Sequence, residues 1–336
     1  MVMAALTATT CILGAHSAVA GDFGGSGAQK SETSTSGDAS GPTLESHVSF
    51  KVEGDLEPKD GGPITSTSMD WEPPACWYEP YWKAKDFKTY MEAQWSIYES
   101  VGGTPEGIAD IKARYTEGKP YNDFNADKND KGMWWVAVKN PEMKDDPAAK
   151  ACTRKPFWVN NGENPDVPQA IDTETLAGLA YQRTKVPDTK ISAAPDSEST
   201  VNLPTWVWLD KTTFKSISVT ASLPGTSLWA TTTAKPVSLH IDPGTDDAAT
   251  FPSSGECTIN ADGSIGEPYV RGKAEEIPPC GVTYLRSSGG SSYALKATLT
   301  WEITWKGAGG TGGDLPNGTF ATTTEVPVQE IQSVNR

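Results

Sequence analysis

The chain has 336 residues, which is enough for two modest domains. Hydrophobic residues make up only 37%, whereas Gly (32) and Pro (25) are abundant, so we expect short strands joined by many turns. The net charge of -15 excludes non-specific nucleic-acid binding, which needs clustered Lys and Arg. The 12 Trp predict small cores built around large aromatic side chains.

Residues 1–20 have the features of a signal peptide. An uncharged apolar run covers residues 6–20 and ends in Ala18-Val19-Ala20, with small residues at the positions that signal peptidase requires. No basic residue precedes the run, which a start codon assigned too late would explain. No later run approaches the ~20 apolar residues of a membrane span. We therefore expect a secreted protein, extracellular or cell-wall associated, without a transmembrane segment in the mature chain.

The cysteine count supports export. Removal of residues 1–20 takes away one Cys and leaves four, an even number that allows two disulfides in three connectivities. The order of the predicted domains favours one pair in each half of the chain. These pairs are Cys76–Cys152 and Cys257–Cys280.

The first half divides into a tether and a mixed domain. Residues 21–68 are rich in Gly, Ser and Thr at their start and predict a flexible tether, in which residues 48–52 alternate like one edge strand. Residues 69–189 predict an α+β domain rich in Trp. Its apolar periodicity indicates helices over residues 86–100, from residue 104 onward and over 173–184, with a buried strand at 133–138.

From residue 190 onward the apolar period changes to two. Strands are predicted over residues 201–209, 216–223, 293–305 and 319–328, and the segment 307–313 reads as a flexible glycine-rich loop. Alternation of this kind is typical of antiparallel strands with one buried face. The predicted fold class is therefore α+β, with the mixed domain followed by an antiparallel β-sandwich over residues 190–336.

Residues 216–305 resemble a PKD-like module, which is a sandwich of the immunoglobulin type. The resemblance rests on the alternating Ser218 to Ala221, on Asp242-Pro243-Gly244-Thr245 after a strand, and on Cys280-Gly-Val-Thr-Tyr284. The best-known element of such modules, Trp-x-Phe-Gly-Asp-Gly, is replaced by Leu-His-Ile-Asp-Pro-Gly at residues 239–244. The resemblance implies a domain that binds or spaces rather than one that catalyses.

A wider resemblance covers residues 69–336. The segments Asn202-Leu-Pro-Thr-Trp206, Cys280-x-x-x-Tyr284-Leu-Arg-Ser-Ser and Glu330-Ile-Gln-Ser-Val-Asn335 are similar to secreted actinomycete proteins of unknown function. This resemblance implies location and fold, and it assigns no activity.

The sequence identifies no catalytic residue. Beyond residue 20 the only His are His47 and His240, neither in a Gly-x-Ser-x-Gly setting, and no Cys-x-x-Cys suggests zinc. With 43 Asp and Glu, acidic pairs are unavoidable, so their abundance is no evidence for a glycosidase. The one acidic residue that we found flanked by apolar side chains, Glu302, is placed on a polar face by the alternation around it.

One loop spaces oxygen ligands as a calcium site does. The alternate residues are Asp123, Asn125, Asp127 and Asn129. However, Lys128 stands at the sixth position, where the sharp turn prefers Gly, and no acidic residue completes the loop. Calcium is the one cofactor that a motif suggests, and an ordinary turn is the alternative.

The Trp residues suggest a binding function. Trp134 and Trp135 are adjacent in a predicted strand and cannot both face one core, so one of them could stack on a sugar ring, as could Trp82. The alternative is that one packs inward and a loop covers the other.

We therefore expect a non-catalytic secreted or cell-surface protein that serves adhesion, assembly or envelope structure. Its partner would be a cell-envelope component or an extracellular protein. Two alternatives stay open: a carbohydrate or cell-wall binding module that uses exposed Trp, and an extracellular hydrolase with a carboxylate pair.

Overall fold

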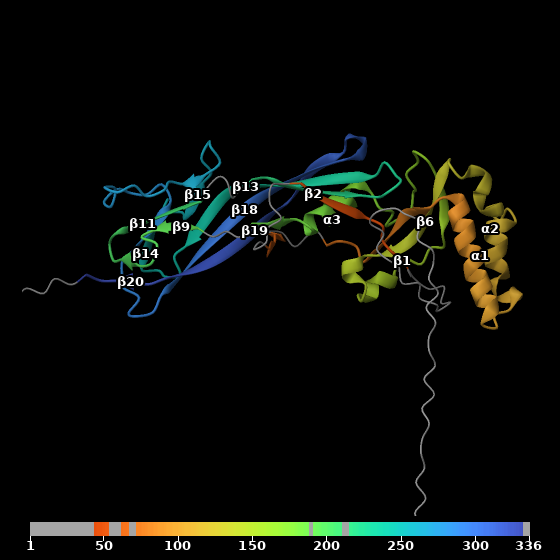
Figure 1. Ribbon diagram of the computed structural model, residues 1–336, viewed down its shortest axis with the longest axis horizontal. Helices are drawn as coiled ribbons and strands as arrows, with labels where there is room; N and C mark the ends of the chain where they lie inside the picture. The colour runs from red at the N-terminus through yellow and green to blue at the C-terminus, as the bar shows by residue number, and fades with distance from the viewer. Residues whose placement is uncertain (1–43, 54–61, 67–71, 188–190, 210–214, 332–336) are drawn as a thin grey trace, which may run out of the picture.

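The computed structural model describes residues 44–53, 62–66, 72–187, 191–209 and 215–331. The predicted signal peptide and most of the predicted tether lie outside these residues. The molecule is elongated, with two helices at one end, small sheets at the other, and long strands between them (Figure 1). Antiparallel sheets dominate and helices are few, as the predicted α+β class requires.

A four-stranded sheet organises the first half. Strand β6 (Gly132–Lys139) lies at its centre, with β5 (Cys76–Trp82) along one edge and β7 (Phe157–Asn160) and β1 (Leu44–Glu45) sharing the other. The predicted buried strand at 133–138 is thus confirmed. Side chains of β6 contribute to two separate hydrophobic cores, so the strand is largely buried.

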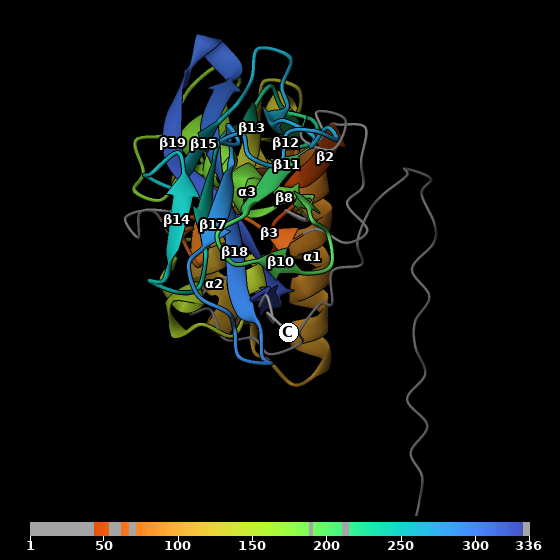
Figure 2. The same ribbon diagram turned by 90° about the vertical axis from the view of Figure 1, so that its left-hand side faces the viewer.

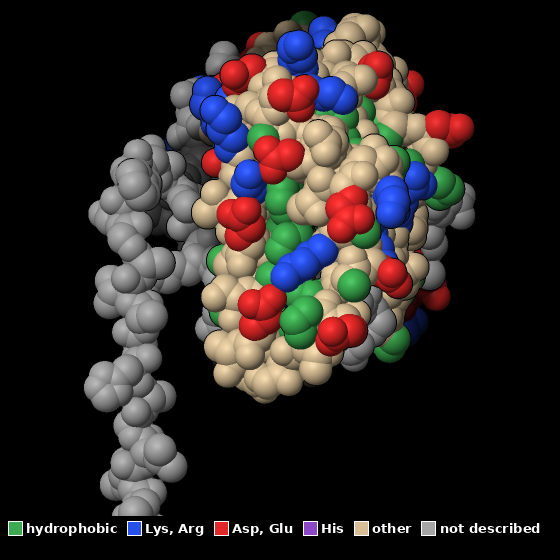
Figure 3. Space-filling model, turned by 90° about the vertical axis from the view of Figure 1, so that its right-hand side faces the viewer, with side chains coloured by type: hydrophobic (Ala, Val, Ile, Leu, Met, Phe, Trp, Pro, Cys, Tyr) green, Lys and Arg blue, Asp and Glu red, His purple; other side chains and the backbone are tan. Residues whose placement is uncertain are grey.

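The helices α1 (Ala84–Ser100) and α2 (Ala109–Thr116) cover one face of this sheet. A short 3-10 turn, Pro105–Ile108, precedes α2 and has Pro at its first position, as the sequence predicted. Phe87, Tyr115, Phe124 and Trp134 form the aromatic core beneath the helices. Figure 3 shows this end of the molecule, where acidic and basic side chains are interspersed around a narrow apolar band.

A seven-stranded sheet runs through the middle of the molecule. Its order is β2, β12, β13, β18, β19, β4, and β15 pairs with β13 beyond the end of β12. The strands are β2 (Ser49–Glu53), β4 (Thr65–Ser66), β12 (Ile217–Ser222), β13 (Trp229–Asp242), β15 (Glu256–Thr258), β18 (Tyr293–Gly307) and β19 (Gly312–Val326).

The segment predicted as a tether takes part in this sheet. Strand β2 pairs along β12, and β4 pairs with β19, so the two border the sheet on opposite sides. The expectation of a flexible tether therefore fails for residues 44–53 and 62–66. For β2 the physical reason is the alternation of side chains from Val48 to Val52, which allows this segment to pair as an edge strand.

The predicted glycine-rich loop is shorter than expected. Strand β19 begins at Gly312 and pairs with the end of β18, so only residues 308–311 form the turn. Backbone pairing extends the β18–β19 ladder through Gly312 and Gly313, which the sequence pattern assigned to a loop.

A five-stranded sheet packs against one end of the long strands. It consists of β9 (Ser192–Ala194), β11 (Pro204–Leu209), β14 (Ala248–Phe251), β16 (Ile265–Gly266) and β17 (Gly281–Tyr284). Figure 2 looks onto this end of the molecule. Side chains of β11 and β17 share one hydrophobic core with Leu239, Leu299 and Trp301 of the long strands. Two short pairs, β3 (Gly62–Pro63) with β8 (Lys185–Val186) and β10 (Ser199–Thr200) with β20 (Val328–Gln329), complete the sheets.

Helix α3 (Thr173–Gln182) joins the two halves. Asp172 caps it by accepting a hydrogen bond from the Thr175 N–H at 2.7 Å, as predicted. Its buried face packs on β12 and β13, where the Thr232 hydroxyl donates to the Ala177 carbonyl at 2.7 Å. One hydrophobic core then combines Leu176 with residues of β5, β6 and β12. The core therefore crosses the boundary that the sequence placed between residues 189 and 190.

Both disulfides have the connectivity that domain order favoured. Cys76 is bonded to Cys152, and Cys257 is bonded to Cys280. The four residues are at most 1% exposed. Among the residues that the structure describes, no helix has the length and apolar character needed to cross a membrane.

Candidate functional site

A groove of about 1030 Å³ lies between the first half and the tips of two hairpins. One wall is the segment 160–165 that follows β7, and a second is the segment 169–173 that leads into α3. The tips of the β12–β13 hairpin, residues 225–228, and of the β18–β19 hairpin, residues 308–311, form the remaining wall. Both hairpins reach toward the half that carries β6 (Figure 1). We name this hollow the main groove.

A side-chain hydrogen bond and packing on the core hold the hairpin tips in place. The Thr311 hydroxyl donates to the Thr173 hydroxyl at 3.0 Å, which ties the β18–β19 tip to the start of α3. Gly225, Gly309 and Gly310 have positive φ, and a Cβ on any of them would meet nothing within 4 Å. The turns therefore need glycine for backbone conformation, and the small residues leave the mouth of the groove open.

Trp135 lies at the floor of the main groove. Its side chain is 6% exposed and packs with Phe157 and Val136 in the core that α3 shares. Trp134, the preceding residue, points to the opposite face of β6 and is fully buried among Phe87 and Tyr115. Alternation in a central strand thus gives each indole a core of its own.

The walls of the main groove carry amide, hydroxyl and carboxylate groups. Among the described residues that line it, none is Lys or Arg, and two are acidic, Glu163 and Asp172. Asn160 donates to Glu163 at 3.0 Å, and Asp172 caps α3, so both carboxylates are oriented by neighbours. Asn164 is exposed in the same wall. An apolar floor below planar polar groups can bind an uncharged polar ligand.

Gln169 has a strained backbone in the wall of the main groove. Its φ is 64°, in the left-handed region that residues other than Gly and Asn rarely adopt. Its carbonyl accepts a hydrogen bond from the Tyr78 N–H at 2.9 Å, while its side chain is exposed. Strain of this kind concentrates at functional positions, so it supports the choice of this groove as the site.

The other predicted Trp ligands lie elsewhere. Trp82 is half-buried and stacks on Tyr90, with ring centroids 4.4 Å apart. Trp134 donates its indole N–H to the Phe124 carbonyl at 3.1 Å and presents no face to a ligand. The expectation of sugar stacking therefore does not apply to Trp134, and of the three predicted Trp only Trp135 lines the main groove.

The predicted calcium ligands serve other partners. Asp123 forms an ion pair with Lys88 at 2.7 Å, Asn129 accepts a hydrogen bond from the Lys85 N–H at 2.9 Å, and Asn125 is buried. Asp127 is exposed. In the parts of the chain that the structure describes, no cluster of three or more His, Cys, Asp or Glu could hold a metal ion. These contacts favour the alternative of an ordinary turn.

The residues weighed for catalysis are separated in the structure. His240 lies on β13 and pairs with Glu256, with 2.9 Å between Nδ1 and Oε1. Glu302 is exposed, as the alternation predicted. Neither residue lines the main groove.

Glu79 is the buried acid that sequence reasoning missed. Its side chain is fully buried and accepts hydrogen bonds from the Ser46 hydroxyl at 2.6 Å, the His47 N–H at 2.7 Å and the Trp77 indole at 2.8 Å. Burial raises the pKa of Glu79 to about 7, although these three donors oppose the shift. The sequence does contain a signal of this burial, because Glu79 stands among aromatic residues in Trp77-Tyr78-Glu79-Pro80-Tyr81-Trp82.

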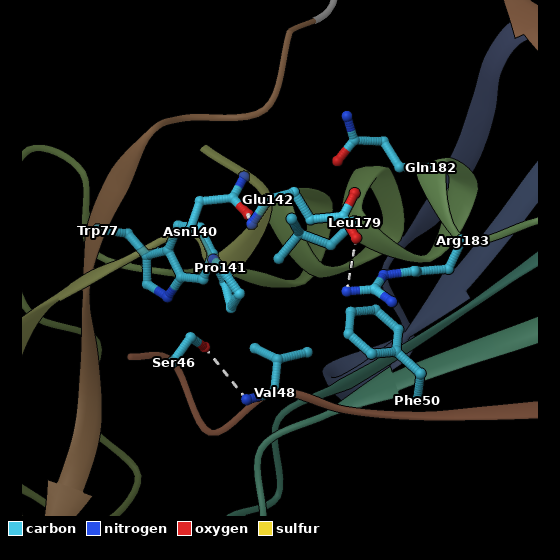
Figure 4. A pocket seen from close by; sticks show the side chains of 10 residues that line it. All are labelled: Ser46, Val48, Phe50, Trp77, Asn140, Pro141, Glu142, Leu179, Gln182 and Arg183. Atoms are coloured by element: carbon cyan, nitrogen blue, oxygen red, sulfur yellow. Dashed lines mark hydrogen bonds and ion pairs between the residues drawn. The ribbon is translucent and has the colours of Figure 1, made fainter. Parts of the chain in front are cut away.

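A small cavity lies beside Trp77 and Ser46 (Figure 4). The ion pair between Arg183 and Glu142, 2.7 Å long, bounds it on one side, and the Arg183 guanidinium lies over the Phe50 ring. Its volume is about 20 Å³, which is room for about one water molecule. This cavity is therefore a packing feature between β2 and α3 rather than a ligand site.

Sequence reasoning missed most of the groove. Asn160, Asn161 and Gly162 were available as a turn signal, and the segment 307–313 was read as a loop. Nothing in the sequence indicates that these segments meet, because the meeting depends on how far the β18–β19 hairpin extends.

Comparison with known proteins does not alter this assignment. No family model, no curated protein and no solved structure matches the chain.

Proposed function

We propose that the protein is an extracellular, non-catalytic carbohydrate-binding protein whose ligand lies in the main groove. The observation that carries the proposal is the lining: an apolar floor that includes the buried Trp135, amide and hydroxyl groups on the walls, and no basic side chain among the described lining residues. Sugars present apolar ring faces and equatorial hydroxyls, so they bind to aromatic surfaces edged by planar polar groups.

Location outside the cell is part of the same proposal. Two buried disulfides are expected in an oxidising compartment. A cell-envelope polysaccharide would then be the natural partner, and adhesion or envelope structure the role.

The proposal extends to the second half of the chain. We propose a PKD-like sandwich of the immunoglobulin type there, supported by the core that β11 and β17 share with β13 and β18. Such a module would hold the groove at a distance from the rest of the envelope.

Retention on insoluble polysaccharides tests the function. Full-length protein would be incubated with cellulose, chitin, xylan, mannan and peptidoglycan, and the bound fraction measured. We expect retention on at least one of them. Asn164→Ala in the groove wall should lower it about tenfold, as the loss of a good polar contact does. Asn122→Ala, a matched change at an exposed Asn outside the groove, should bind as the wild type does.

The same experiment separates the alternatives. Absence of retention on every polysaccharide would overturn the proposal. Release of soluble sugars would instead favour the hydrolase reading, in which Glu163 and Asp172 would be the carboxylates to substitute first.

A further inference from the structure

A second hollow lies on the other side of the β18–β19 turn. Its volume is about 780 Å³, and it is lined by Trp229, Trp305, Lys306 and the glycine-rich turn. Ser227, Ala308, Gly309 and Thr311 line both this hollow and the main groove. The two hollows are therefore contiguous across the hairpin tips. We name the second one the tip hollow.

Trp229 is the exposed aromatic of the tip hollow. Its side chain is 41% exposed, which makes it the only Trp among the large hydrophobic side chains that the described structure leaves exposed. It stands at the first position of β13, where it pairs with Ser222 at the end of the hairpin. An exposed indole at this position can offer an aromatic face to a ligand.

Trp305 is half-buried and packs against the core that α3 shares, beside the glycines of the β18–β19 turn. Gly313 is its partner in the β18–β19 ladder, and a Cβ at Gly313 would lie 3.4 Å from the Trp305 indole nitrogen. A Cβ at Gly307 would lie 3.0 Å from the far carbon of the same ring. A Cβ at Gly307 would also meet the side chains of Thr173 and Thr311, so Gly313 is the position at which a side chain can be added beside the indole.

We propose that the tip hollow is a second stacking subsite of the same binding site, so that the ligand is a linear, uncharged polysaccharide bound as a chain of several sugar units across the β18–β19 turn. This inference rests on the proposed function and names its ligand class. Two aromatic positions beyond the main groove extend the contact with the sugar chain. Glu163 and Asp172 in the main groove disfavour an anionic chain, and Lys306 in the tip hollow disfavours a cationic one.

Chain-length dependence of affinity tests the inference. The probes are the trisaccharide and the hexasaccharide of the uncharged polysaccharide that retains the protein, measured by calorimetry with the full chain. We expect the hexasaccharide to bind about tenfold more tightly, because it alone reaches both hollows. Equal affinities for the two would overturn the inference and leave the proposed function standing.

Two variants locate the extra affinity. Trp229→Ala removes an exposed ring, and Gly313→Val adds a side chain beside Trp305 at a position where φ is not positive. Each should reduce hexasaccharide affinity to the trisaccharide level and leave trisaccharide affinity unchanged. Leu285→Ala, which removes an exposed apolar side chain outside both hollows, is the control.

The outcomes separate this inference from the function on which it rests. Wild-type length dependence that survives in both variants would show that the extra contacts lie elsewhere, and it would overturn the tip hollow alone. Failure of the wild type to bind any polysaccharide or oligosaccharide would overturn both proposals.

Discussion

The hydroxyls of Thr311 and Thr173 lie 3.0 Å apart, although 138 positions separate the two residues in the chain. This contact joins the tip of the β18–β19 hairpin to the first residue of α3. It closes the wall of the main groove where the two halves of the molecule meet. The shape of the site therefore depends on the seating of one hairpin.

Removal of this contact should affect binding more than stability. Thr311→Val keeps the side-chain volume and removes the hydroxyl, which also donates to the Ala308 carbonyl at 2.9 Å. We expect the free energy of unfolding to fall by about 1 kcal/mol, the net value of an ordinary hydrogen bond. Polysaccharide retention should fall several-fold because the tip loses its anchor. Thr323→Val, at an exposed position farther along β19, should change neither quantity, and equal effects of the two variants would contradict the argument.

Strands with strong alternation were predictable from the sequence. In β18, Leu295, Leu299 and Ile303 are buried while Lys296 and Glu302 are exposed, as a period of two requires. Helix α3 was likewise predictable, because Asp172 caps it and its apolar residues recur at helical spacing. Local chemistry decides these elements, so one chain suffices to find them.

The site was predictable only in part, through Trp135. Its neighbours in the main groove come from segments that meet through strand pairing, and no local pattern specifies that meeting. The burial of Trp134 depends similarly on α1 and α2 covering one face of β6. The acidic Glu79 was missed because its burial arises from residues 46–48, which looked like part of a tether.

Gln169 provides a test of functional strain. Gln169→Gly relieves a left-handed backbone that costs about 1 kcal/mol or more, while glycine adds unfolded-state entropy worth about 0.4–1 kcal/mol. We therefore expect the free energy of unfolding to stay equal or rise slightly, as measured by urea titration. Polysaccharide retention should fall, since the amide leaves the groove wall. Gln169→Ala keeps the strain and should lose binding without any gain in stability; a stability gain in this variant would count against the strain argument.

The two disulfides should differ in their contribution to stability. Cys76–Cys152 spans 76 positions and Cys257–Cys280 spans 23. In the chain-entropy model the longer loop contributes roughly 4 kcal/mol and the shorter roughly 3 kcal/mol. Replacement of each pair by Ala should therefore destabilise the protein more for Cys76 and Cys152, as measured by urea unfolding. A larger loss from the shorter loop would mean that the packing of the sulfur atoms, and not loop closure, dominates.

Glu79 should make stability depend on pH. Its folded pKa of about 7 lies above the ordinary value of 4.5 for a glutamate, so the folded state holds the proton more tightly than the unfolded state. The protonated Glu79 contributes its full share of the unfolding free energy below about pH 4.5. That contribution is lost as the pH rises through about 7. The full loss is roughly 3 kcal/mol. Burial lowers the pKa of His47 from its ordinary value of 6.5, so the stability that this group contributes is lost as pH falls below 6.5.

Comparison with Glu79→Gln isolates the carboxyl contribution, because His47 titrates in both proteins. Gln is neutral at every pH, so the difference in unfolding free energy between wild type and variant should favour the wild type most near pH 4.5. That difference should then shrink as pH rises to about 7, where the wild type must bury a charge. Glu142→Gln, which replaces a half-exposed carboxyl beside the same small cavity, serves as the control variant. A constant difference between wild type and Glu79→Gln across this range would mean that the three donors from Ser46, His47 and Trp77 stabilise the carboxylate enough to cancel the cost of its burial.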